Sequence, residues 1–185
     1  RFMLSKVPQG NYVVFSGEKA DDNAKIFKDG AIKVLQPLID SKKINIVYSG
    51  YMNDWSGLNA AFYIDKIIEY SNVDIHAIIS TYDGLSDGIA SVLKERNLTD
   101  KIFLTGQDAE IAACNRILNN LQAMTVYKPG KLLAYTCAEV TMKLIKNEKI
   151  ENLKYIYNGR IDVPTIILDP TAVDKNNLES TVIAD

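Results

Sequence analysis

The stretch "TGQDAEIAACNRILNNLQAMTVYKP", from Thr105 to Pro129, joins the end of one apolar strand to the next strand through a helix. Apolar residues recur at helical spacing in Ala109–Asn120, whereas Ala123–Tyr127 is a short apolar run typical of a buried strand. Asp108 stands where the first strand gives way to the helix, and Lys128 stands where the second strand ends. Charged residues at two neighbouring strand ends indicate a site rather than a solvated surface.

The same strand–helix unit recurs along most of the chain. Strands are predicted at Asn11–Gly17, Ile44–Tyr51, Ile75–Thr81, Lys101–Gly106 and Ala123–Tyr127. Helices are predicted at Asp21–Asp40, Gly57–Ser71, Gly88–Asn97, Ala109–Asn120 and Lys131–Asn147. Strict alternation of apolar strands with helices favours a parallel sheet covered on both faces, and right-handed crossovers make it doubly wound. The predicted fold class is therefore α/β with a doubly wound parallel sheet.

The rhythm breaks after Asn147, so residues 1–150 are predicted to form one lobe and residues 151–185 a separate segment. That segment carries two prolines and a strand-like run at Thr165–Leu168, with no convincing helix of its own. A strand without a crossover helix ends a self-contained sheet poorly. We therefore expect residues 151–185 to belong to a neighbouring lobe or to an edge.

Composition excludes several classes of protein. The chain of 185 residues has a net charge of −2, which disfavours binding to the phosphate backbone of nucleic acids. No apolar run approaches the roughly 20 residues of a membrane span. The start "RFMLSKVPQG" lacks the features of a signal peptide, so we expect an exported protein to be present here in mature or truncated form. Cys114 and Cys137 both fall in predicted helices; a disulfide is possible, but small core or near-surface residues are the preferred interpretation.

Motifs for catalysis and cofactor binding are missing from the sequence. No G-x-G-x-x-G follows the first strand, and neither a phosphate-binding loop nor a G-x-S-x-G elbow occurs. The single histidine, His76, lies within a predicted strand, where it is expected to be a packed residue rather than a member of a triad. One histidine and two scattered cysteines cannot build a tetrahedral zinc site without carboxylates. We therefore expect no enzyme activity, no metal and no cofactor.

The carboxyl ends of the predicted strands carry a particular set of side chains. In chain order these are Asp21, Asn23, Trp55, Tyr82, Asp108 and Lys128. Ligands of doubly wound sheets bind at this edge, near the point where the strand order reverses. Carboxylates, amides and an ammonium group can satisfy sugar hydroxyls, which both donate and accept, and an aromatic face suits the C–H side of a sugar ring. The set therefore favours a monosaccharide site.

A structural role is the alternative for several of these residues. Asp21, Asn23 and Asp108 all precede helices, where capping alone would explain them. Trp55 could pack between lobes or lie on the surface rather than stack on a ligand. Lys128, which precedes Pro129, has the weakest structural explanation, because a strand that ends before proline needs no cation.

Five segments resemble the bacterial D-xylose-binding proteins of the type I periplasmic-binding-protein group. They are "VPQGNY" (Val7–Tyr12), "DNAK…GAIKVLQPLIDS" (Asp22–Ser41), "TGQDAEIAACNRI" (Thr105–Ile117), "MTVYKP" (Met124–Pro129) and "DKNNLESTVI" (Asp174–Ile183). The resemblance covers nearly the whole chain. It implies a Rossmann-like carboxyl-terminal lobe with a final segment that returns to a second, amino-terminal lobe of the same protein.

The resemblance also implies ligand contacts. The family's acid and amide after the first strand fall on Asp21 and Asn23, its stacking tryptophan on Trp55, and its last acid and lysine on Asp108 and Lys128. The family asparagine after the third strand is replaced by Tyr82, which is bulkier and cannot donate and accept as an amide does. The identity and the affinity of the sugar are therefore expected to depend on this substitution.

By the same resemblance, the protein would be an extracytoplasmic receptor, in the periplasm or anchored at the cell surface. It would close around D-xylose or a related pentose and present its closed shape to an ABC permease or to a membrane histidine-kinase sensor. Two alternatives stay open at this point. One is a receiver-like phosphoacceptor domain using Asp83 with Lys128, and the other is the effector domain of a sugar-responsive transcription regulator.

Overall fold

The computed structural model describes residues 1–184. Their contacts divide the chain into two compact units, which are described separately below. The first unit comprises Arg1–Tyr127 and Ala172–Ala184, and the second comprises Lys128–Thr171. Compactness thus separates the units after Tyr127, whereas the sequence rhythm predicted a boundary at residue 150. The assignment of residues 151–185 to another lobe stays a prediction.

The first unit alternates strands and helices as the sequence predicted. Its elements are α1 (Phe2–Lys6), β1 (Gly10–Ser16), α2 (Asp22–Asp40), β2 (Ile44–Tyr51), η1 (Asn53–Trp55), α3 (Gly57–Tyr70), β3 (Ala77–Ser80), α4 (Asp83–Glu95), β4 (Phe103–Leu104), α5 (Ile111–Leu118), β5 (Thr125–Tyr127), β8 (Thr171–Val173) and η2 (Glu179–Ile183). The short helix α1 and the helical turn η2 were not predicted. Among the helices of residues 1–184, none has the length and apolar character needed to cross a membrane.

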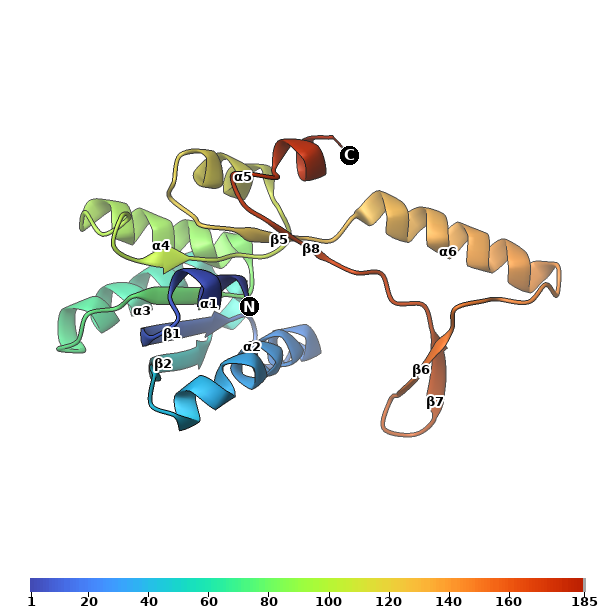
Figure 1. Cartoon of the computed structure of the whole chain (residues 1–185), viewed down its shortest axis with the longest axis horizontal. Helices are drawn as coiled ribbons and strands as arrows, with labels where there is room; N and C mark the ends of the chain where they lie inside the picture. Colours follow the sequence, from blue (N-terminus) through green and yellow to red (C-terminus); the bar gives the residue numbers. More distant parts are fainter. Residues whose placement is uncertain (185) are drawn as a thin grey trace. The chain divides into compact units, whose positions relative to one another are not determined.

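The central sheet is parallel and has the strand order β2-β1-β3-β4 (Figure 1). β5 runs beside β4 through a parallel bridge between Thr105 and Met124. Backbone hydrogen bonds of 2.7 Å from Ala123 to Leu104 and 3.0 Å from Gly106 to Met124 extend this contact. Because β2 and β3 lie on opposite sides of β1, the strand order reverses there. The predicted α/β doubly wound fold is therefore confirmed.

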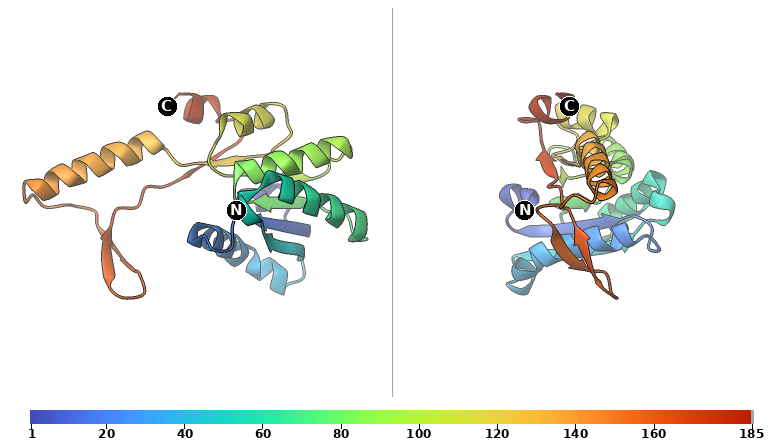
Figure 2. Two further views of the ribbon diagram at one scale, coloured as in Figure 1. Left: turned by 180° about the vertical axis from the view of Figure 1, so that it is seen from behind. Right: turned by 90° about the vertical axis from the view of Figure 1, so that its right-hand side faces the viewer.

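Alternate side chains of β1 and β3 enter two separate cores, as the two-residue period of a strand requires. Val13, Phe15 and Ile78 pack with α3 and α4 on one face of the sheet. Tyr12 and Ala77 pack with α1 and α2 on the other face. The sheet thus lies between these two pairs of helices, as Figure 2 shows.

The largest local departure from the predicted elements is the start of α4. α4 begins at Asp83, five residues before the predicted helix start at Gly88. A Cβ atom added to Gly88 would lie 1.9 Å from the backbone oxygen of Gly57 at the start of α3. The glycines therefore permit a close approach of two helices rather than a turn.

The second unit consists of α6 (Gly130–Ile145) and an antiparallel hairpin of β6 (Lys154–Tyr157) and β7 (Asp162–Thr165) (Figure 1). The predicted strand Thr165–Leu168 is wrong in position. The observed strand, β7, ends at Thr165, which pairs with Lys154 of β6. α6 has no buried residues. Its exposed large apolar side chains are Leu132, Leu133, Tyr135, Met142, Leu144 and Ile145.

Three single residues can be compared with their sequence interpretation. Cys114 is buried and Cys137 is exposed, and neither forms a disulfide within residues 1–184. This supports the interpretation as core and surface residues. His76 lies one residue before β3 and is exposed, with its Nδ1 accepting a hydrogen bond of 3.1 Å from the amide of Asn11. The expectation that His76 packs within a strand is therefore wrong, because β3 begins later than predicted.

Candidate ligand-binding site

The carboxyl ends of β1, β3 and β4 form one edge of the sheet, around the reversal of strand order. Ligands of doubly wound folds bind at such an edge, so the residues that follow these strands are the candidate ligand contacts. The predicted residues Asp21, Trp55, Tyr82 and Asp108 belong to the first unit, as does Asn23. Lys128 directly follows β5 and is exposed, and it belongs to the second unit.

Trp55 lies over the end of β1. A Cβ atom added to Gly17 would be 2.0 Å from the indole ring, so the ring rests on the glycine backbone. The turn that carries the indole is unusual, because Asp54 and Trp55 both have positive φ angles, of 55° and 52°. Glu18 fixes this turn by accepting a hydrogen bond of 2.9 Å from the amide of Asp54. Positive φ costs a non-glycine residue on the order of 1–3 kcal/mol, and such positions cluster at ligand sites.

Tyr82 stands next to Trp55 at the end of β3. The two rings meet edge to face, with centroids 5.7 Å apart and an interplanar angle of 89°. The phenol ring covers Gly84, where an added Cβ atom would lie 2.3 Å from Cε1. A hydrogen bond with the Glu110 side chain, followed by burial, raises the pKa of the Tyr82 hydroxyl. Tyr82 therefore connects Trp55 to the residues that follow β4.

Asp108 lies on a second strained turn. Asp108 and Ala109 have φ angles of 102° and 57°, and the Asp108 side chain is exposed. The next residue, Glu110, precedes α5 and interacts with Tyr82. Trp55, Tyr82, Glu110 and Asp108 thus follow one another across the edge, an aromatic pair next to two carboxylates.

Asp83 lies beneath the Asp108 turn and is fully buried. Its carboxylate accepts hydrogen bonds from Gln122 Nε2, at 2.9 Å, and from the amide of Glu110, at 3.1 Å. Thr125 Oγ1 lies 2.8 Å from Asp83 Oδ2 and 3.0 Å from Oδ1. Burial raises the pKa of Asp83, while these hydrogen bonds act in the opposite direction. A phosphoacceptor must be reachable by a phosphate donor, so the receiver-like alternative for Asp83 is wrong.

Asp21 and Asn23 form the N-terminal cap of α2. Asp21 is the N-cap residue, and its Oδ1 accepts a hydrogen bond of 2.8 Å from the amide of Asn23. The Asp21 side chain is partly buried, whereas Asn23 is exposed. The capping role that the sequence left open for Asp21 is therefore present. Capping occupies one carboxylate oxygen and is compatible with a ligand contact through the other.

Sequence reasoning missed three residues of this edge. Glu110 was interpreted only as part of a helix start, where acids are common. Gly17 was interpreted only as a strand end and Gly84 was assigned no role, although each supports an aromatic ring. A small residue next to a ring cannot be recognised from one sequence, because the contact depends on tertiary structure.

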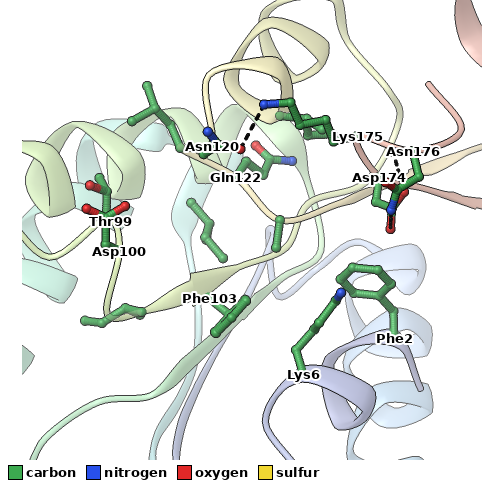
Figure 3. Close-up of a pocket in the computed structure, with 15 residues that line it drawn as sticks. Phe2, Lys6, Thr99, Asp100, Phe103, Asn120, Gln122, Asp174, Lys175 and Asn176 are labelled. Carbon is green, nitrogen blue, oxygen red and sulfur yellow. Dashed lines mark hydrogen bonds between the residues drawn. The ribbon is translucent and has the colours of Figure 1, made fainter. Parts of the chain in front are cut away.

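A cavity of about 300 Å³ is lined by both residues of β4 and by the segment that precedes β5. Figure 3 shows its lining, with Lys6 and Phe2 on one side and Asn120, Gln122 and Lys175 on another. Its polar groups already bind one another: Lys175 Nζ donates to Asn120 Oδ1 at 3.2 Å, and Gln122 binds Asp83. These side chains stabilise the fold and do not converge on a ligand. Nowhere in residues 1–184 do three or more metal-ligating side chains gather.

The fold and the edge define a ligand-binding lobe of the doubly wound type. Residues 1–149 match the family model described as a periplasmic binding protein domain. The chain belongs to this family.

Several relatives and structural neighbours are sugar-binding proteins by name. The chain is 40% identical over 178 residues to the D-xylose-binding periplasmic protein of Haemophilus influenzae, covering 96% of this chain and 54% of that protein. It is 38% identical over 183 residues to the D-xylose-binding periplasmic protein of Escherichia coli, covering 99% and 56%. A carbohydrate transporter solute binding protein from Chloroflexus aurantiacus, in complex with D-glucose, is similar with a TM-score of 0.83 and 25% identity, covering 95% and 59%. The chain spans about half the length of the curated relatives that it matches.

Proposed function

We propose that this chain is one lobe of an extracytoplasmic receptor that binds D-xylose or a related pentose without transforming it. The observation that carries the proposal is the row of Trp55, Tyr82, Glu110 and Asp108 across the edge where the strand order reverses. An aromatic face next to carboxylates fits the C–H side and the hydroxyls of a sugar ring. Similarity to two D-xylose-binding periplasmic proteins supports the choice of sugar.

In the proposed site Asp108 binds one sugar hydroxyl, and Asp21 and Asn23 bind others. Lys128 is proposed, from the family resemblance alone, as a further hydroxyl contact. Trp55 lies against the ring. Each hydroxyl both donates and accepts, so a wrong sugar would leave buried polar groups unpaired, which supplies specificity. The site needs neither a metal nor a cofactor.

A second lobe completes the proposed site. The relatives are nearly twice as long as this chain, and α6 exposes a row of large apolar residues that a partner surface would bury. Sugar contacts from both lobes favour the closed state, so binding shifts an open–closed equilibrium. A permease or a membrane sensor kinase then recognises the closed shape.

Calorimetry with a panel of pentoses and hexoses tests the proposal. The complete two-lobed protein should bind D-xylose with measurable heat, and Trp55→Leu should weaken binding by about two- to tenfold, since stacking of this kind contributes about 0.5–1.5 kcal/mol beyond burial of area. Leu58→Ala is a matched control, because Leu58 is an exposed apolar residue near the same loop. Absence of binding to every sugar in the panel would refute the proposal.

A further inference from the structure

Three successive amides of the Asp108 turn are each held by a partner from another element. The amide of Asp108 donates to Val126 O at 2.9 Å, and the amide of Ala109 donates to Thr125 Oγ1 at 3.1 Å. The amide of Glu110 donates to Asp83 Oδ2 at 3.1 Å. Backbone in the positive-φ region persists where its surroundings over-determine it. These contacts are such surroundings.

Asp83 and Thr125 act together on this turn. Thr125 has one hydroxyl proton, which it donates to Asp83, while its oxygen accepts from Ala109. Asp83 also accepts a hydrogen bond from Gln122 Nε2. It packs so closely against Gly106 that a Cβ atom added to Gly106 would lie 2.0 Å from Asp83 Oδ1. The carboxylate is thus fixed in position and orientation by its own neighbours.

The orientation of Gln122 is fixed as well. Its Oε1 accepts from Arg116 Nε at 2.9 Å, and its Nε2 also donates to Met124 O at 3.0 Å. Arg116 is buried and also binds Asp87 and the backbone oxygen of Asp83. In Asp83→Asn the side-chain NH2 group would face a donor in either orientation, namely Gln122 Nε2 or the amide of Glu110. Gln122 cannot reverse its own amide without breaking its contacts with Arg116 and Met124.

We propose that Asp83, through Thr125 and the amide of Glu110, is a positioning residue that holds the strained Asp108–Ala109 turn in its ligand-binding geometry. This inference rests on the proposed function, in which Asp108 binds a sugar hydroxyl. Asp83 itself is buried and touches no ligand. This positioning role accounts for the presence of a carboxylate at a position where burial raises its pKa.

The first test is Asp83→Asn in the complete two-lobed protein, with Asp87→Asn as the matched control. Both changes remove one charge from α4 next to Arg116, but only Asp83 contacts the turn. Asp83→Asn should weaken D-xylose binding by about ten- to a hundredfold, the range for a lost hydrogen bond to a charged group, and Asp87→Asn should leave it unchanged. Equal affinities for Asp83→Asn and wild type would overturn the inference.

A double-mutant cycle separates positioning from a general loss of structure. If Asp83 acts through Asp108, Asp83→Asn should cost little further affinity once Asp108→Asn is present. Fully additive effects would show that Asp83 acts elsewhere. Thr125→Val and Thr125→Ser serve if Asp83→Asn does not fold: the valine variant should lose affinity and the serine variant, which keeps the hydroxyl, should recover it. Equal affinities of these two variants would contradict the inference.

Hydrogen exchange gives a readout that needs no sugar. The amides of Ala109 and Glu110 should exchange about tenfold faster or more in Asp83→Asn than in wild type, and at the wild-type rate in Asp87→Asn. Slow exchange of both amides in Asp83→Asn would refute the positioning role even if sugar binds. Conversely, faster exchange in Asp83→Asn, together with no sugar binding to wild type, would support the positioning role of Asp83 and refute only the proposed function.

Discussion

Replacing Gly88 with alanine tests how closely α3 and α4 must approach. The added Cβ would lie 1.9 Å from Gly57 O and 2.6 Å from Gly57 C, whereas contacts under 3.0 Å are essentially never seen. The helices must therefore separate by about 1 Å or more. Overpacking typically costs about 1–3 kcal/mol, and the better helix propensity of alanine returns about 1 kcal/mol. Because the obstacle is backbone that cannot rotate away, we expect a net loss of about 1–2 kcal/mol.

Gly30→Ala is the matched control for Gly88→Ala. Gly30 also lies inside a helix, α2, but an added Cβ would meet nothing within 4 Å. This change should stabilise the protein by about 0.5–1 kcal/mol through helix propensity alone. Urea unfolding followed by circular dichroism measures both free energies of unfolding. The reasoning fails if Gly88→Ala is as stable as Gly30→Ala.

Three further predictions concern single side chains. Asp21→Ser should keep the α2 cap but weaken sugar binding, whereas Asp21→Ala should lose the cap as well, which lowers the free energy of unfolding by about 1 kcal/mol. Equal sugar affinities of Asp21→Ser and wild type in calorimetry would show that Asp21 is not part of the site. Burial raises the pKa of Tyr12 to about 12 from 10.0, so the stability that Tyr12 contributes is complete below pH 10 and is lost as the pH rises towards 12. Alkaline unfolding should show this loss in wild type but not in Tyr12→Phe, and parallel curves would contradict it. Tyr82→Asn should strengthen D-xylose binding about two- to tenfold, since an amide both donates and accepts; weaker binding would show that the Tyr82 side chain contributes more to the sugar contact than an amide at this position.

The centre of the sheet could be predicted from the sequence because β1 and β3 are mostly buried and form continuous apolar runs. Ile44–Tyr51 was predicted as a strand and is β2 with the same bounds. The start of α4 was predicted five residues too late, at Gly88, because the packing of Gly84 on the Tyr82 ring and of Gly88 on the backbone of α3 depends on tertiary structure. α6 was predicted as a helix, but its periodicity could not tell which surface covers its apolar side chains.

The candidate site was predictable in its location but not in its construction. Doubly wound topology and the positions of Trp55, Tyr82 and Asp108 after strands indicated the edge in advance. The positive φ angles of Asp108 and Ala109 could not be foreseen, because they depend on Asp83 and Thr125, which are distant in sequence. Burial likewise excludes Asp83 as a surface phosphoacceptor, which its position after a strand had left open.

A structure of the complete protein crystallised with D-xylose would test the central claim most directly. We expect one sugar ring against the indole of Trp55, with a hydroxyl within about 2.5–3.0 Å of a carboxylate oxygen of Asp108. Xylose bound in the cavity of Figure 3, or at any place that leaves Trp55 and Asp108 untouched, would contradict the account.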